Sequence, residues 1–364
     1  MEIGLHEKIE IIDACDVVAR FQIRAIQLGV PNPDNIDDFE RLVEVYLGPA
    51  GVTHIMLCLD YSFEYKSHPE IVEYPCTTVD VAKRVSEICR RNSIEVVPGI
   101  NVLAHQSTIF QGWEPRGILR AYPDMEEKFE GEIHSSKCVC SRHPKLRPIV
   151  YDMIDDLMEA FDTKVIHTGF DEVWDIGKCP RCKGVPDYIL FAQYINDLND
   201  FIKSRGGNMW MWGDQLIDGY LVPSSNPGYE TCVSSLHKAV DLISKDILIC
   251  DWHYYDEPLG QLSPAYWVVK GLPFITCAFN SVHGTDQLLY ATRVVQDAPN
   301  TKGTMLTTWC KLEAFIRLVE EKYPEYVKTG KLNYDPSIEN SSIENRNNFA
   351  DQSSNMFLKM FVKR

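Results

Sequence analysis

The sequence predicts an α/β protein built as a closed (β/α)8 TIM barrel, and three features of the chain lead to that prediction. Short runs rich in β-branched and aromatic residues alternate eight times with longer stretches of helical periodicity. The alternation extends over most of the 364 residues, a length that suits a barrel of this kind. The turn after the first run, QLGVPNP, lacks the glycine-rich pattern that opens a doubly wound sheet.

The predicted strands and helices follow one another in a regular order. Strands are expected at residues 21–28, 54–60, 94–100, 164–169, 208–213, 246–252, 273–279 and 303–309. Helices are expected at residues 36–47, 78–91, 146–161, 187–204, 233–244, 284–297 and 311–322. In the second of these helices, apolar residues recur at helical spacing, and Thr77 or Thr78 is suited to cap the first turn. Strand and helix therefore alternate as a repeated βα unit demands.

One catalytic barrel domain is expected over residues 1–330, followed by a polar C-terminal tail over residues 331–364. The segment at about 101–145 is too long for a simple loop and carries aromatic residues and prolines, so we expect an excursion at the active site. The tail is polar and repeats the short sequence SIEN, and we expect it to have no role in the fold.

The charge balance excludes several classes of partner. The chain has 36 basic and 52 acidic residues, which argues against nucleic acid and against an anionic membrane surface. No run of 18 apolar residues predicts a transmembrane helix. The start, MEIGLHEKIE, has no apolar signal segment, so we expect a cytoplasmic protein. Twelve scattered cysteines in a chain of this length indicate reduced thiols rather than a disulfide framework.

Polar and aromatic residues gather where the predicted strands end. In a (β/α)8 barrel the active site is built at the carboxyl ends of the strands, so these residues are the candidates for it. Aromatic faces beside carboxylates suit a sugar, which has apolar C–H faces and a rim of hydroxyl groups. The alternative is that each tryptophan is an ordinary core residue. The candidates are Asp60, His105, His167, Asp171, Glu172, Trp212, Asp214, Trp252, His253, Asn280 and Trp309.

Asp171 and Glu172 are the strongest chemical signal among these candidates. Side chains alternate along a strand, so Asp171 would continue the side of His167 and Gly169. Glu172 would reach the same site only if the chain turns there, which a glycine makes easier. Two close carboxyl groups titrate apart, and this leaves one proton donor and one anion near neutral pH, as glycoside cleavage requires. Alternatively, the pair is the acidic first turn of a helix.

The motif HTGFDEVW (167–174) resembles the H-x-G-G-D-E signature of glycoside hydrolase family 20, the exo-β-N-acetylhexosaminidases. Three further stretches are similar to that family in the same order: LDYSFEYKSHPEI (59–71), VPGINVLAHQS (97–107) and WCKLE (309–313). The resemblance covers roughly residues 20–320. It is closest to the single-domain branch that includes hexosaminidase D, which lacks the usual N-terminal α+β domain.

The resemblance implies a retaining reaction in which the 2-acetamido group of the substrate attacks the anomeric carbon, with no cofactor required for catalysis. Asp171 would orient the acetamido group, Glu172 would be the acid and base, and His105 with Asp60 behind it would tune that acid. The substrate would carry a terminal N-acetylhexosamine, either GlcNAc or GalNAc. The sugar-binding set would contain Trp212, Asp214, Trp252, His253, Asn280, Trp309 and His167, although His167 fits a buried structural role equally well.

Departures from the family pattern keep two alternatives open. Phe170 replaces the second glycine of the signature, and Lys311 stands where the family places a glutamate. No arginine follows the first strand. These differences allow a catalytically weak barrel that only binds sugars. A metal-dependent hydrolase using His105, His167, Asp214 and His253 is the other alternative, although no H-x-H motif follows the first strand.

Four cysteines have spacings that suit a metal ion. Cys138 and Cys140 lie in CVCSRH, and Cys179 and Cys182 lie in CPRCKG, after the third and fourth predicted strands. Together they could supply four thiolates to tetrahedral zinc, with His143 as a fifth candidate ligand. Four protein ligands would leave no open position, so the zinc would be structural. The alternative is reduced loop cysteines or a redox pair.

Overall fold

The computed structural model describes residues 13–107, 114–127, 137–332 and 346–363, and in it eight parallel strands close into a barrel. The strands pair in chain order, and β1 also pairs with β8 to complete the ring. This confirms the predicted fold and all eight predicted strands. The strands are β1 (Ile23–Leu28), β2 (His54–Cys58), β3 (Glu95–Gly99), β4 (Val165–His167), β5 (Asn208–Trp212), β6 (Leu248–Trp252), β7 (Phe274–Ala278) and β8 (Thr301–Leu306).

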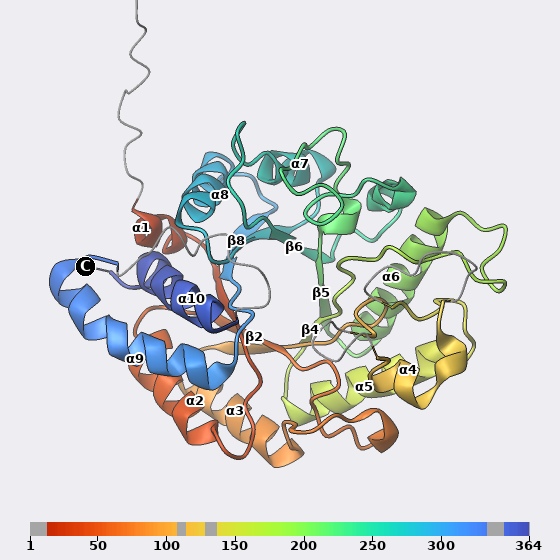
Figure 1. Cartoon of the computed structure of the whole chain (residues 1–364), viewed down its shortest axis with the longest axis horizontal. Helices are drawn as coiled ribbons and strands as arrows, with labels where there is room; N and C mark the ends of the chain where they lie inside the picture. Colours follow the sequence, from red (N-terminus) through yellow and green to blue (C-terminus); the bar gives the residue numbers. More distant parts are fainter. Residues whose placement is uncertain (1–12, 108–113, 128–136, 333–345, 364) are drawn as a thin grey trace, which may run out of the picture.

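Helices surround the barrel (Figure 1). The cap of α3 is Thr78, whose hydroxyl oxygen accepts a hydrogen bond from the Val81 N–H. The α-helices are α1 (Ala14–Val18), α2 (Ile36–Leu42), α3 (Val79–Arg91), α4 (Gly117–Ala121), α5 (Leu146–Ala160), α6 (Asp187–Ser204), α7 (Ser263–Lys270), α8 (Val282–Val294), α9 (Leu312–Thr329) and α10 (Arg346–Phe361). A π-helix, η1 (Val43–Leu47), extends α2, and 3-10 turns form η2 (Pro69–Ile71), η4 (Pro123–Met125), η5 (Asp214–Leu216) and η6 (Ser235–Asp241).

Besides the short helices α1 and α4, which were not expected, two elements next to β6 in the chain differ from the sequence-based expectation. The α-helix expected at 233–244 is the 3-10 segment η6 instead. The helix α7 was not expected, because its eight residues are too few to show a clear helical period. The segment η6 precedes β6 in the chain, and α7 connects β6 to β7.

The core has two parts, inside and outside the strands. The inside of the barrel is filled by side chains that include Trp210, Trp212, Trp252, Cys250 and Cys277. The other strand faces pack against the helices and form the larger part of the core. All twelve cysteines are free thiols, in agreement with the expectation from composition. Among the described residues, no helix is both long and apolar enough to cross a membrane.

The tail expected to have no role in the fold contains α10, and that expectation is wrong for residues 346–361. Phe349, Met356 and Phe357 of α10 are buried in the main core. The helix packs against α9, α1 and β8 (Figure 1), and Lys322 of α9 pairs with Asp351 at 2.7 Å. The polar average of the tail hid a run, NMFLKMFV, with enough apolar area to dock on the barrel. Residues 333–345, with both copies of SIEN, lie outside the described residues.

The excursion between β3 and α5 has little regular structure in its described parts. It contains α4, η4 and two isolated antiparallel bridges, one of which joins Glu126 to Val139. Residues 108–113 and 128–136 of the predicted excursion lie outside the described residues.

Candidate active site at the carboxyl end of the barrel

Five residues that follow strands have left-handed backbone conformations, which only glycine adopts at little cost. Their φ angles lie between 45° and 74°, and they follow β2, β3, β4 and β8 at the carboxyl end of the barrel. Backbone strain of this kind costs about 1–3 kcal/mol per residue and concentrates at functional sites. The five residues are Asp60, His105, Phe170, Glu172 and Trp309. Four of them were candidates from the sequence, and the fifth, Phe170, lies inside the signature motif.

The turn after β4 depends on Gly169. Its φ is +74°, and a Cβ atom there would lie 1.9 Å from Oδ1 of Asn101, so any other residue would be strained and would have to displace Asn101. Phe170 then turns outward and packs against Phe191 and Tyr194 of α6. Its extra bulk, relative to the glycine of the family signature, is therefore taken up by the helix layer and not by the site.

This turn brings Asp171 and Glu172 to the same side, beside His105. His105 Nε2 lies 3.1 Å from Oδ2 of Asp171 and 3.7 Å from Oε2 of Glu172. The other oxygen of Asp171, Oδ1, is buried and has no hydrogen-bond partner among the described residues. The two adjacent carboxyl groups therefore face one site, as the sequence-based hypothesis required.

The pKa values of this group differ in their consequences: Glu172 can donate a proton, whereas His105 carries a positive charge. Burial, opposed by His105 and reinforced by Asp171, raises the pKa of Glu172 to about 7. Burial lowers the pKa of His105, but the Asp171 carboxylate outweighs it, and with Glu172 and Asp60 the pKa of His105 rises to about 10. Near pH 7, His105 is therefore cationic, and Glu172 keeps its proton more readily than an ordinary glutamate does.

Asp60 lies behind this group and is held by the excursion. Its Oδ1 accepts a hydrogen bond from the Asn101 N–H at 2.9 Å, and its Oδ2 lies 3.5 Å from Arg116. Arg116 is fixed in turn by Glu73, at 3.1 Å. Through its charge, Asp60 makes the smallest of the named contributions to the raised pKa of His105.

Asp214 holds the turn after β4 in place. It is buried and accepts hydrogen bonds from the Glu172 backbone N–H at 2.9 Å, from Trp252 Nε1 at 3.1 Å and from Gln215 Nε2 at 2.8 Å. Burial, followed by the charge of Asp171, raises its pKa. Asp214 was predicted to bind the sugar, but the structure places it as a support for Glu172 and Trp252.

Three predicted aromatic residues come together at the same end of the barrel. The rings of Trp212 and Trp309 are 5.8 Å apart, and Trp252 lies 5.0 Å from Tyr254. The Trp309 indole N–H donates to the Tyr254 hydroxyl oxygen at 2.9 Å. The Thr307 hydroxyl also donates to this oxygen, at 3.2 Å, so the Tyr254 hydrogen stays available for a ligand. Tyr254 was not among the predicted site residues, although it directly follows two of them.

Three other predicted sugar ligands are engaged elsewhere. His167 is buried, its Nδ1 accepts from the Gly169 N–H, and burial lowers its pKa to about 3, which fits a neutral structural histidine. Asn280 donates to Gln352 of α10. The prediction for His253 is wrong: alternation along β6 turns Trp252 inward and His253 outward, to Asp251 and Ser263 of α7.

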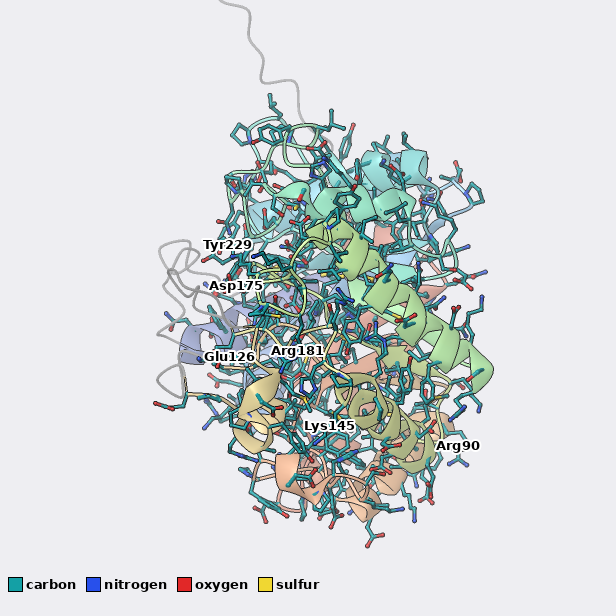
Figure 2. All side chains as sticks on the ribbon, turned by 90° about the vertical axis from the view of Figure 1, so that its right-hand side faces the viewer. Arg90, Glu126, Lys145, Asp175, Arg181 and Tyr229 are labelled. Atoms are coloured by element: carbon teal, nitrogen blue, oxygen red, sulfur yellow. The ribbon has the colours of Figure 1, made fainter. Side chains whose placement is uncertain are left out.

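The side view in Figure 2 places the loops that follow β3, β4 and β5 on one side of the molecule. Glu126, Asp175 and Tyr229 of these loops lie toward that side, whereas Arg90, at the end of α3, lies toward the opposite one. The candidate residues follow the carboxyl ends of the strands, the end at which barrels of this kind carry their chemistry.

The family model for the catalytic domain of glycosyl hydrolase family 20 matches residues 64–278, more than half of the chain. The chain belongs to glycosyl hydrolase family 20. The matched range contains the turn after β4, Asp214 and the excursion. The resemblance found in HTGFDEVW is therefore confirmed.

Relatives from this family cover the chain to different extents. The beta-hexosaminidase of Akkermansia muciniphila is 25% identical over 105 residues, which are 28% of this chain and 20% of that protein. A chitobiase from Flavobacterium johnsoniae has a TM-score of 0.58 at 17% identity, over 94% of this chain and 53% of its own. A Vibrio harveyi exo beta-N-acetylglucosaminidase, in complex with N-acetylglucosamine, has a TM-score of 0.59 at 14% identity, over 95% and 59%. These structures share the fold, and the chain spans under two thirds of each relative.

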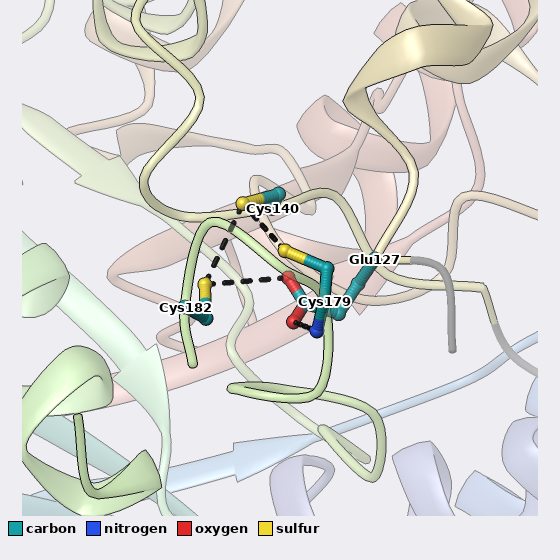
Figure 3. Close-up of side chains that lie close together, drawn as sticks. All are labelled: Glu127, Cys140, Cys179 and Cys182. Atoms are coloured by element: carbon teal, nitrogen blue, oxygen red, sulfur yellow. Dashed lines mark hydrogen bonds between the residues drawn. The ribbon is translucent and has the colours of Figure 1, made fainter. Parts of the chain in front are cut away.

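A second cluster in this family 20 chain involves the predicted metal ligands. Cys140, Cys179 and Cys182 gather with Glu127 (Figure 3). Cys138 was predicted as the fourth ligand and is not part of the cluster; its thiol interacts with the Asp175 backbone. In extended chain, residues two apart lie nearly 7 Å from each other, so only one thiol of C-x-C reaches the centre. Likewise, His143 is directed to Asp124, at 3.1 Å.

The structure also bears on the alternative of a metal-dependent hydrolase. In the described part of the chain, the one group of three or more His, Cys, Asp or Glu side chains with mutually close ligand atoms is the cluster around Cys140. His105, His167, Asp214 and His253 do not come together, because His253 points to the helix layer and Asp214 to a backbone N–H.

Proposed function

We propose that this family 20 protein is a retaining exo-β-N-acetylhexosaminidase that uses the substrate's acetamido group as its nucleophile. The observation that carries the proposal is the buried Oδ1 of Asp171, which has no partner among the described residues. An unpaired buried carboxylate oxygen costs on the order of 1–3 kcal/mol or more, and the acetamido N–H of a bound sugar would satisfy it.

The residues around Asp171 suit the charges of such a reaction. The acetamido N–H would donate to Asp171 Oδ1, which makes the carbonyl oxygen more nucleophilic and stabilises the positive oxazolinium-like intermediate. Glu172, with its pKa raised to about 7, would give its proton to the leaving oxygen. The resulting carboxylate would then take a proton from the water that opens the intermediate, so that the anomeric configuration is retained.

His105 and the aromatic residues would position these groups. The His105 cation holds Oδ2 of Asp171, which leaves Oδ1 directed to the substrate. The Trp212 and Trp309 rings offer apolar faces for the sugar C–H groups, and the Tyr254 hydroxyl lies at the edge of that aromatic group. Either N-acetylglucosamine or N-acetylgalactosamine fits this chemistry, since neither the acid nor the acetamido partner distinguishes the two at C4.

One observation favours the alternative of a barrel that binds sugars with little catalysis. Glu313, the carboxylate closest in sequence to the family's expected glutamate, is bonded to Asn35 at 2.7 Å. It therefore does not replace the hydroxyl-binding residue that Lys311 displaces.

The test compares 4-nitrophenyl β-glycosides of GlcNAc, GalNAc and glucose on the wild type, Glu172→Gln and Asp171→Asn. We expect turnover of an N-acetylated substrate, none of the glucoside, and losses of roughly 10²–10⁴-fold in kcat for both variants. Equal rates on the glucoside would exclude acetamido participation. Binding of N-acetylhexosamine without turnover by the wild type would favour the sugar-binding alternative.

A further inference from the structure

The cluster of Glu127, Cys140, Cys179 and Cys182 lies outside the proposed reaction and joins two separate segments of the chain. Glu127 and Cys140 belong to the excursion after β3, and Cys179 and Cys182 belong to the loop between β4 and α6. All four side chains are buried, and one possible ligand atom of each lies within 4.8 Å of the others. Figure 3 shows them facing a common centre.

The spacing of these atoms matches a tetrahedral metal site. Cys140 Sγ lies 3.4 Å from Cys179 Sγ and 3.6 Å from Cys182 Sγ, and Cys182 Sγ lies 3.7 Å from Glu127 Oε2. A tetrahedral zinc ion, with Zn–S bonds of about 2.3 Å and a Zn–O bond of about 2.1 Å, spaces two sulfurs about 3.8 Å apart. The same geometry spaces a sulfur and an oxygen about 3.6 Å apart. The sulfurs are too far apart for a disulfide, which needs about 2.05 Å.

The protein alone compensates the charge of Glu127 poorly. Its Oε1 accepts a hydrogen bond from the Cys179 N–H at 2.7 Å, but among the described residues the one donor to its Oε2 is a thiol, which is a weak donor. A buried carboxylate is costly unless it is paired with a cation or well hydrogen-bonded. A metal ion at Oε2 would supply that pairing, and the Cys179 N–H would orient the carboxylate from behind, as is usual for metal ligands.

We propose that Glu127, Cys140, Cys179 and Cys182 bind one zinc ion in a structural site. Three thiolates select a thiophilic cation over Mg²⁺ or Ca²⁺, and four protein ligands close the coordination sphere. Binding of Zn²⁺ releases three thiol protons and leaves a centre of net charge −2. The loop with two of the ligands also carries Lys178, Arg181 and Lys183, which place positive charge nearby.

The zinc ion would act as a cross-link that holds the catalytic loop. The segment with Cys179 begins only seven residues after Glu172, and its backbone already contacts the excursion through the Cys179 N–H, which donates to Glu127. Tying this segment to the excursion, which carries His105, fixes two parts of the site relative to each other. The inference concerns folding and metal content, so it stands independently of the proposed glycosidase activity.

The first test is the metal content of the full chain after gel filtration, measured by elemental analysis. We expect about one zinc per chain, and less than a tenth of that for Cys182→Ser and Glu127→Ala. The matched control is Cys138→Ser, a buried neighbouring thiol outside the cluster, which should keep its zinc. A wild type without stoichiometric metal would overturn the proposal, and zinc loss from Cys138→Ser equal to that from Cys182→Ser would overturn the ligand assignment.

A second test uses only the wild type, in case the ligand variants fail to fold. Chelation should release the zinc, expose three additional thiols to a thiol reagent and lower the Tm, and added zinc should restore it. Replacement by cobalt should give the intense absorption of tetrahedral thiolate coordination. An unchanged Tm and thiol count on chelation, or a mass 2 Da low that indicates a disulfide in this cluster, would contradict the proposal. Loss of turnover at an unchanged Tm would indicate a catalytic metal instead.

Discussion

The backbone N–H of Glu172 donates a hydrogen bond to Oδ2 of Asp214, 2.9 Å away, and thereby ties the proposed acid to the loop after the next barrel strand. The same carboxylate holds the indole of Trp252 through its other oxygen. One buried side chain therefore holds both the proposed proton donor, Glu172, and the Trp252 ring in position.

Asp214→Asn should lower kcat about 10–100-fold with a smaller change in KM, because an amide has one acceptor oxygen for three donors. Steady-state kinetics on the preferred 4-nitrophenyl substrate would measure this. The control is Asp241→Asn, an exposed residue paired with Lys270, which should leave both constants unchanged. Equal kinetics for Asp214→Asn and the wild type would show that the anchor has no part in positioning Glu172.

The pH dependence should report on Glu172 and His105 together. Glu172 must be protonated for the first step, so kcat/KM should fall as the pH rises above about 7. His105 lowers the pKa of Glu172, so His105→Gln should reduce the rate and move this alkaline limb to higher pH.

The exposed His283 provides the control, since His283→Gln should leave the pH profile unchanged. If the alkaline limb of the kcat/KM profile stays in place in His105→Gln, or moves to lower pH, the electrostatic coupling between His105 and Glu172 is contradicted.

Gly169→Ala should damage the catalytic turn more than backbone strain alone explains. Gly206 has nearly the same φ, +73°, but its added Cβ would meet no atom within 4 Å. We expect Gly206→Ala to lower stability by about 1 kcal/mol and Gly169→Ala to do so by more, with at least tenfold lower activity. Denaturant unfolding and kinetics would measure the two effects. If the clash with Asn101 is the cause, adding Asn101→Ala should recover part of the lost stability.

Phe357→Ala tests whether α10 belongs to the barrel. The ring is fully buried against Phe315 of α9, so its removal should lower the free energy of unfolding by about 3–5 kcal/mol. Denaturant unfolding would measure the change. Lys363→Ala, at an exposed residue just after α10, should change it by less than about 0.5 kcal/mol. An unchanged free energy of unfolding in Phe357→Ala would mean that α10 does not pack against the barrel in solution.

The sequence predicted the structure best where a pattern of residues has few alternative explanations. Eight alternating apolar runs predicted the barrel, and the adjacent acids Asp171 and Glu172 predicted the site, because each pattern needs only local periodicity and strand-end position. The turn that brings Glu172 inward could be stated only as a condition, since the φ angles of Phe170 and Glu172 are not encoded by their residue types.

The errors arose where three-dimensional direction decides. Trp252 and His253 are neighbours at the end of β6, and only the closed barrel shows which of the two side chains points inward. Glu127 joined the cysteine cluster in place of Cys138, because a carboxylate 52 residues from Cys179 gives no signal at metal-ligand spacing. The helix α10 was missed because its polar residues, such as Gln352 and Ser353, are buried through hydrogen bonds to Asn280 and Thr308.

The docking of α10 on α1 and β8 brings opposite ends of the described chain together. A polypeptide emerging from the ribosome can assemble its early strands, but the contacts of α10 with α1 and β8 cannot form completely until residue 361 has left the exit tunnel. Folding of this barrel is therefore completed only after α10 has been synthesised, and a nascent chain stalled before α10 would present an uncovered apolar surface to chaperones.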